Sequence, residues 1–81
     1  MEVRVTFYSQ LRDLAGAPEF DVDLPEKATV ANLLEIIYAK VPALRARDKT
    51  ILVGAGVEFV ERSYELKTGD EISIMPPVQG G

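Results

Sequence analysis

The sequence contains neither cysteine nor histidine. Without cysteine, the chain forms no disulfide and has no thiolate that could act as a nucleophile or carry sulfur. Because cysteine and histidine are the usual zinc ligands, a structural or catalytic zinc site is not expected. No apolar run approaches the length of a membrane span, and the N-terminal residues lack the apolar region of a signal peptide. These absences favour a soluble, cytoplasmic protein.

Positive charge is also scarce. The 81 residues include nine Lys and Arg against thirteen Asp and Glu, which gives a net charge of −4. Nucleic acids and anionic membranes both select basic surfaces, so neither is expected as a partner. The length corresponds to one domain, and the apolar share of 47% suffices for a small core.

Two stretches near the N-terminus, residues 3–8 and 20–24, alternate apolar and polar side chains with the period of a half-buried strand. The alternation in the first stretch turns three side chains toward the core: Val3, Val5 and Phe7. Tyr8 then points to the opposite face. Between the two strands, Ser9 is expected to cap a short helical turn that stops at Gly16.

One amphipathic helix is predicted over residues 30 to about 40. Its apolar side chains recur at the i, i+3, i+4 spacing of a buried stripe: Val30, Leu33, Leu34, Ile37 and Val41. Thr29 is a suitable N-cap, and Pro42 ends the helix. Residues 44–49 are interpreted as a polar connector with one apolar anchor.

The C-terminal half predicts three further strands. Residues 51–53 form a short apolar strand, Gly54-Ala55-Gly56 is read as the turn after it, and residues 57–60 return as a brief partner strand. In the last strand, residues 71–75, the alternation turns Ile72 and Ile74 toward the core. It places Ser73 and Met75 on the opposite face.

This order of elements predicts an α+β fold. One helix with a single apolar stripe fits across one apolar face of a mixed, twisted sheet of four to five strands. The first and last strands are expected to pair in parallel at the centre of the sheet, which is the ubiquitin-like β-grasp arrangement. We assign residues 1–75 to this domain.

Residues 76–81 cannot continue the last strand, and we interpret them as a flexible C-terminal tail. Its residues are Pro76, Pro77, Val78, Gln79, Gly80 and Gly81. The two prolines lack the N–H that a strand ladder needs and hold the backbone extended. The two final glycines let the end thread where a bulkier one would clash. The carboxylate of Gly81 is therefore an unhindered electrophile once it is activated.

Three segments resemble MoaD-type sulfur carriers, the small subunits of molybdopterin synthase. Residues 7–16, FYSQLRDLAG, resemble the opening of the family, and residues 24–34 resemble its entry into the helix, with LPE followed by TVANLL. The ending, GDE followed by IMPPVQGG in residues 69–81, is the most specific part. One departure is Gly56, which stands where the family usually has asparagine.

The resemblance implies a carrier cycle in which partner enzymes supply the catalysis. A MoeB-like adenylating enzyme would use ATP and Mg²⁺ to convert the Gly81 carboxylate into an acyl-adenylate. A sulfur donor such as a cysteine desulfurase or rhodanese would then leave a thiocarboxylate. The tail would deliver this sulfur in the active site of a MoaE-like large subunit, within a heterotetramer. The chain would bind no cofactor and would not be catalytic alone.

Four residues are candidate partner contacts. Alternation places Tyr8 and Met75 on the non-core face, and Phe59 is expected near them in the short strand. Arg12 matches a position in the family's opening. If the three apolar side chains gather beside the tail, they indicate a docking patch.

Three other functions remain open from the sequence. A thiamin-type sulfur carrier would use the same chemistry with a different acceptor, and a ubiquitin-like modifier would join Gly81 to lysines. A plain interaction domain would have no use for the terminal glycines. The acidic stretch from Asp21 to Asp23 is interpreted as solvated surface.

Overall fold

A computed structural model describes residues 1–77. The predicted sites at Val78, Gln79, Gly80 and Gly81 lie outside the described residues. These residues form eight helices and strands and one 3-10 turn: β1 (Glu2–Phe7), α1 (Gln10–Ala15), β2 (Glu19–Asp23), α2 (Val30–Lys40), α3 (Pro42–Arg45), η1 (Asp48–Thr50), β3 (Leu52–Ala55), β4 (Glu58–Phe59) and β5 (Glu71–Met75).

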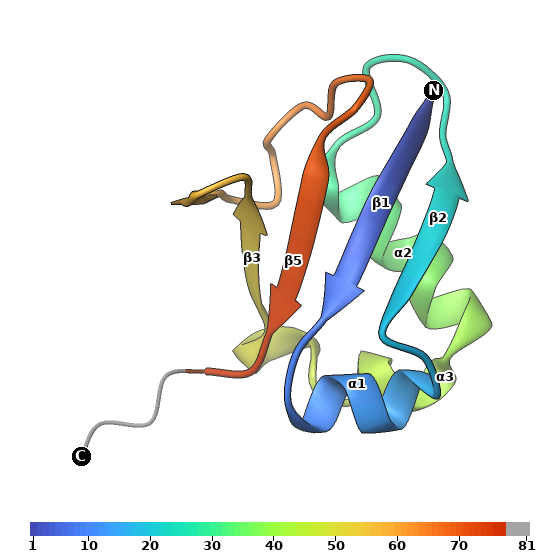
Figure 1. Ribbon diagram of the computed structural model, residues 1–81, viewed down its shortest axis with the longest axis vertical. Coiled ribbons are helices and arrows are strands. Elements are labelled where there is room, and N and C mark those ends of the chain that lie inside the picture. Colours follow the sequence, from blue (N-terminus) through green and yellow to red (C-terminus); the bar gives the residue numbers. More distant parts are fainter. Residues whose placement is uncertain (78–81) are drawn as a thin grey trace.

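The five strands form one mixed sheet in the order β2-β1-β5-β3-β4. β1 and β5, the first and last strands of the chain, pair in parallel at its centre, and all other pairs are antiparallel. α2 crosses behind the sheet in Figure 1, while α1 and α3 lie at the end where β5 finishes. The predicted β-grasp arrangement is confirmed, with five strands.

The core lies between α2 and one face of the sheet. The five strand side chains that were predicted to face the core are buried: Val3, Val5, Phe7, Ile72 and Ile74. Val22, Leu24 and Val53 are buried with them. The helix contributes a stripe of five: Val30, Leu33, Leu34, Ile37 and Tyr38. Tyr38 was not predicted to be buried, and Val41, which was predicted to belong to the stripe, is half-buried beyond the end of α2.

α2 begins as predicted at Thr29. The Thr29 hydroxyl accepts a hydrogen bond from the backbone N–H of Asn32, and the Asn32 side chain accepts one from the backbone N–H of Thr29. These two bonds satisfy backbone donors that the first turn of a helix leaves unpaired. Among residues 1–77, neither α2 nor any other helix has the length and apolar character needed to cross a membrane.

The prediction that Ser9 caps α1 through its side chain is wrong. Ser9 has φ 53° and ψ −131°, and its hydroxyl makes no capping hydrogen bond. An N-cap side chain reaches the helix from an extended backbone, a conformation that this positive φ excludes. The stop at Gly16 is confirmed, because Gly16 adopts φ 74° and its N–H donates to the carbonyls of Arg12 and Asp13.

Two further local predictions are corrected. The expected polar connector over residues 44–49 is largely helical, since Pro42 starts α3 and a 3-10 turn follows at Asp48–Thr50. Gly54 belongs to β3 and not to a turn, because it pairs with neighbouring strands on both sides. The turn itself is formed by residues 56 and 57, with Gly56 at φ 62°.

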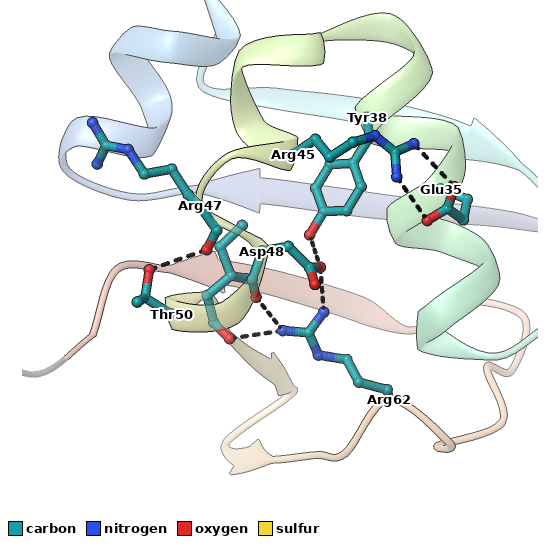
Figure 2. Close-up of polar contacts among 8 residues, drawn as sticks. Glu35, Tyr38, Arg45, Arg47, Asp48, Thr50 and Arg62 are labelled. Carbon is teal, nitrogen blue, oxygen red and sulfur yellow. Dashed lines mark hydrogen bonds and ion pairs between the residues drawn. The ribbon is translucent and has the colours of Figure 1, made fainter.

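A polar cluster fastens the loop after β4 to the 3-10 turn (Figure 2). The guanidinium of Arg62 donates to the Asp48 carboxylate at 2.9 Å and to the backbone carbonyls of Asp48 and Ile51 at 2.8 and 3.1 Å. The Tyr38 hydroxyl donates to the same carboxylate. Burial, together with this bond, raises the pKa of Tyr38 to about 12. The Tyr38 hydrogen bond, followed by Arg62, lowers the pKa of Asp48.

We expect the free energy of unfolding to fall between about pH 10 and pH 12. Because folding raises the pKa of Tyr38, this group stabilises the folded state fully at pH values below its unfolded pKa, which is near 10. The stabilisation is lost as the pH rises through the folded pKa. Tyr38→Phe should flatten this alkaline loss in urea unfolding measured across the range. Some loss should persist, because burial and Asp70 also raise the pKa of Tyr64. An equal alkaline slope in wild type and variant would contradict the prediction.

Candidate docking face at the root of the C-terminal segment

The face of the sheet that α2 leaves uncovered carries the candidate site, and it faces the viewer in Figure 1. Strand register places one row of small side chains across it, because Thr6 pairs with Ser73 and Ser73 pairs with Gly54. Phe59 pairs with Gly54 and ends this row. Met75, opposite Leu52 on β3, belongs to the next row.

These rows leave a hollow of about 160 Å³ in the apolar half of the face. It is lined by Tyr8, Gly54, Gly56, Val57, Glu58, Phe59, Ser73 and Met75. Val57 and Phe59 are exposed by 102% and 69%, and Tyr8 by 45%. Single exposed apolar residues are common, but several around one hollow are typical of a binding surface. The three apolar residues proposed as partner contacts therefore lie together.

Met75 links this hollow to the C-terminal segment. It is the last residue of β5, and Pro76 follows it directly. Pro76 and Pro77 line a neighbouring polar cleft together with Ser9, Gln10, Arg47 and Thr50. Arg47 donates to the Gln10 side chain at 3.4 Å. The root of the segment thus lies between an apolar hollow and a polar cleft.

Arg12 lies apart from the other candidate residues. It is exposed on α1 and lines a separate depression with Asp13, Gly16, Ala17 and Pro18. The fold therefore does not bring Arg12 into the hollow with Tyr8, Phe59 and Met75. The proposed reactive carboxylate of Gly81 lies outside the described residues.

Two lining residues were missed by the sequence reasoning for different reasons. Gly54 was assigned to a turn, so its place in the lining of this hollow could not be expected. Ser73 was placed on the correct face by alternation, but a small polar side chain gives no signal of its own. Ser73 lies in the hollow because the register of β5 on β3 pairs it with Gly54.

The other half of the same face is acidic. Outward side chains of β1, β2 and the start of β5 carry five carboxylates and one guanidinium: Glu2, Glu19, Asp21, Asp23 and Glu71, with Arg4. Arg4 pairs with Asp21 at 3.4 Å, and both side chains are exposed. Within residues 1–77, no group of three His, Cys, Asp or Glu side chains is placed to hold a metal ion.

The fold defines a ubiquitin-like protein, a small β-grasp domain in which α2 covers one face of the sheet and leaves the other face open. The model of the ThiS family matches residues 5–81. The chain belongs to this family, and the resemblance to MoaD-type proteins found in its sequence is confirmed.

Curated relatives and solved structures agree with this assignment. The molybdopterin synthase sulfur carrier subunit of Drosophila yakuba is 35% identical, over 100% of this chain and 92% of that protein. A putative molybdopterin converting factor, subunit 1, from Pyrococcus furiosus superposes with a TM-score of 0.88 and 29% identity, covering 96% of this chain and 99% of that one. SAMP1 from Haloferax volcanii, a small archaeal modifier protein, also gives 0.88, at 28% identity and full coverage of both chains.

A further solved neighbour is a two-protein assembly. The BexX/CysO complex of Amycolatopsis orientalis contains a chain that superposes with a TM-score of 0.73 at 28% identity. The alignment covers 98% of the present chain and 99% of that one. Proteins of this fold are therefore found both alone and in complexes.

Proposed function

We propose that this protein is the sulfur carrier subunit of a molybdopterin synthase. The observation that carries the proposal is the position of the apolar hollow at the root of the C-terminal segment. Four residues follow Pro77, and an extended chain of that length reaches at most about 14 Å. A partner whose active site receives Gly81 must therefore dock close to this root, where the hollow lies.

The proposed chemistry needs two activating partners. A MoeB-like enzyme uses Mg-ATP to join the Gly81 carboxylate to AMP, with release of pyrophosphate. A carboxylate is a poor electrophile until its oxygen becomes a good leaving group, which adenylation provides. The persulfide of a sulfur donor, a cysteine desulfurase or rhodanese, then displaces AMP and forms an acyl disulfide with the Gly81 carbonyl. A second thiol attacks the donor's sulfur, forms a disulfide with the donor cysteine and releases the thiocarboxylate. The sulfur must come from outside because the chain has no cysteine.

The third partner is a MoaE-like large subunit, with which the carrier forms a heterotetramer. In its active site the thiocarboxylate passes sulfur to a cyclic pterin phosphate precursor. The names of the similar proteins support the pairing with a large subunit, since they describe subunits of molybdopterin synthase or of a molybdopterin converting factor. The carrier contributes the reacting terminus and the docking face, and the large subunit contributes the catalytic residues.

Incubation with the adenylating enzyme, Mg-ATP and a sulfur donor should add the mass difference between one sulfur and one oxygen. Intact-mass and peptide analysis should map the change to Gly81, because the chain offers no thiol as another acceptor. If the adenylating enzyme is active and releases AMP but the carrier gains no mass, the proposal is contradicted. A mass gain at another residue, with Gly81 unchanged, would contradict it as well.

A ubiquitin-like modifier is the second candidate, favoured by the similarity to SAMP1 over the full length of both chains. Activation is the same as far as the adenylate, but the terminus then forms an isopeptide bond to a lysine. Tryptic peptides from cell lysate that carry the C-terminal glycine remnant on lysine would support the modifier. Thiocarboxylate in the absence of such conjugates would support the carrier.

A further inference from the structure

Gly54 stands at a position where the backbone does not require glycine. Gly16, Gly56 and Gly69 have positive φ, a conformation that side chains disfavour, whereas Gly54 lies in the middle of paired strands. A Cβ at Gly54 would lie 3.3 Å from the Met75 methyl, 3.4 Å from the Glu58 carbonyl and 3.7 Å from the Ser73 Cβ. The closest of these atoms is the end of a flexible side chain, so alanine fits with a small shift.

Glycine inside a strand weakens the strand, because it loses more backbone freedom and packs no side chain. The fold alone would therefore favour a larger residue at position 54. What glycine provides instead is space in the lining of the hollow, since a side chain at position 54 would press on the methyl of Met75, which lines the same hollow. An apolar cavity of about 150 Å³ accepts benzene, so a hollow of about 160 Å³ matches one aromatic ring or branched aliphatic side chain.

The charge on the same face indicates which groups would surround a partner side chain bound in the hollow. The acidic half, defined above by Glu2, Glu19, Asp21, Asp23 and Glu71, continues from the hollow across β5, β1 and β2. A second copy of this chain would bring its own acidic half and a net charge of −4 to the contact. Electrostatic complementarity instead favours a partner with basic groups.

We propose that the hollow over Gly54 is a socket for one large apolar side chain of the large subunit, and that basic residues beside this side chain face the acidic half. This inference rests on the proposed function, because it names the chemistry of the contact that the carrier makes. Gly54 is then a specificity-determining residue that is kept small to leave the socket open.

Gly54→Val and Gly54→Ala test the socket, with Ala39→Val as the matched control. Valine at position 54 adds volume to the lining of the hollow, whereas Ala39→Val adds a valine on the exposed surface of α2, which covers the opposite face of the sheet. Binding to the large subunit of the same organism, measured by calorimetry, should weaken by about 10- to 100-fold for Gly54→Val. It should weaken less for Gly54→Ala and remain unchanged for Ala39→Val. Thermal unfolding of the free Gly54→Ala protein should be at or above the wild-type midpoint.

Wild-type affinity in both folded Gly54 variants would overturn the socket. If Gly54→Val fails to fold, Gly54→Ala decides the question alone, because its Cβ fits the strand.

The rate of association with the large subunit should also fall as ionic strength rises from about 0.05 to 0.5 M. A rate that does not change with ionic strength would overturn the basic character of the partner. Sulfur loading of Gly81 by the adenylating enzyme separates the two proposals. If the wild-type protein is loaded and Gly54→Val still binds the large subunit with wild-type affinity, only the socket is refuted. If the wild-type protein is not loaded, the carrier function is refuted.

Discussion

Deletion of Gly81 is expected to lower the rate of sulfur loading by a factor of about a hundred or more, while the affinity for partners stays close to that of the wild type. The shortened chain still ends in a carboxylate, on Gly80, with nearly the same chemistry. That carboxylate is about 3.5 Å short of its former reach. Catalytic geometry tolerates far less, because an error of about 1 Å can cost a hundredfold in rate. The deletion does not change the lining of the hollow, whose residues lie between Tyr8 and Met75.

Intact-mass measurement of thiocarboxylate formation checks this result, with binding to the adenylating enzyme measured on the same samples. Gln79→Ala is the matched control, since it changes the tail but keeps its length and both glycines. Efficient loading of the protein lacking Gly81 would show that reach does not limit the reaction. Equal loss in Gln79→Ala would attribute the defect to recognition of the tail and not to its length.

Met75→Asp is expected to weaken binding to the large subunit by at least about 2 kcal/mol, which corresponds to about 30-fold in Kd. Met75 lines the hollow directly before Pro76, so the change places a charge in the centre of the proposed interface. The cost is the desolvation of that charge against an apolar partner group. The domain should stay folded, because the side chain lies on the face away from the core and is half-buried.

Ala39→Asp provides the control for added negative charge, because Ala39 is exposed on α2, which covers the opposite face of the sheet. Binding by calorimetry and folding by circular dichroism separate the two effects. Phe59→Asp offers an independent variant, since that side chain is 69% exposed. If both variants unfold, Met75 and Phe59 support the core, and if both bind normally, the hollow is not the docking site.

The strands were largely predictable because alternation reports directly which side chains are buried. The residues at 3, 5 and 7 and at 72 and 74 are buried as the period-two pattern predicts, and β5 has the predicted bounds. The helix was predictable for a similar reason, since the capping residue at Thr29 and the apolar stripe of α2 are local signals. Each of these signals lies within one element.

The errors arose where a local pattern had more than one meaning. Ser9 is a residue type that often caps helices, but its backbone conformation prevents the capping bond. The three residues from Gly54 to Gly56 contain two glycines, and only the second is the turn glycine, because pairing with β4 and β5 holds the first in a strand. The cluster of Tyr38, Asp48 and Arg62 joins three separate segments, so no local pattern announced it.

The sequence by itself determined the class of fold, most of the residues in the core, and the chemistry that the chain lacks. These follow from the periods of burial and from composition, which do not depend on distant contacts. Only the tertiary structure decided that Tyr8, Phe59 and Met75 line one hollow together with Gly54. These residues come from four strands or strand ends, and the parallel pairing of β1 with β5 fixes their neighbourhood. Strand register is a property of the assembled sheet, because its free energy comes from contacts between segments far apart in the chain.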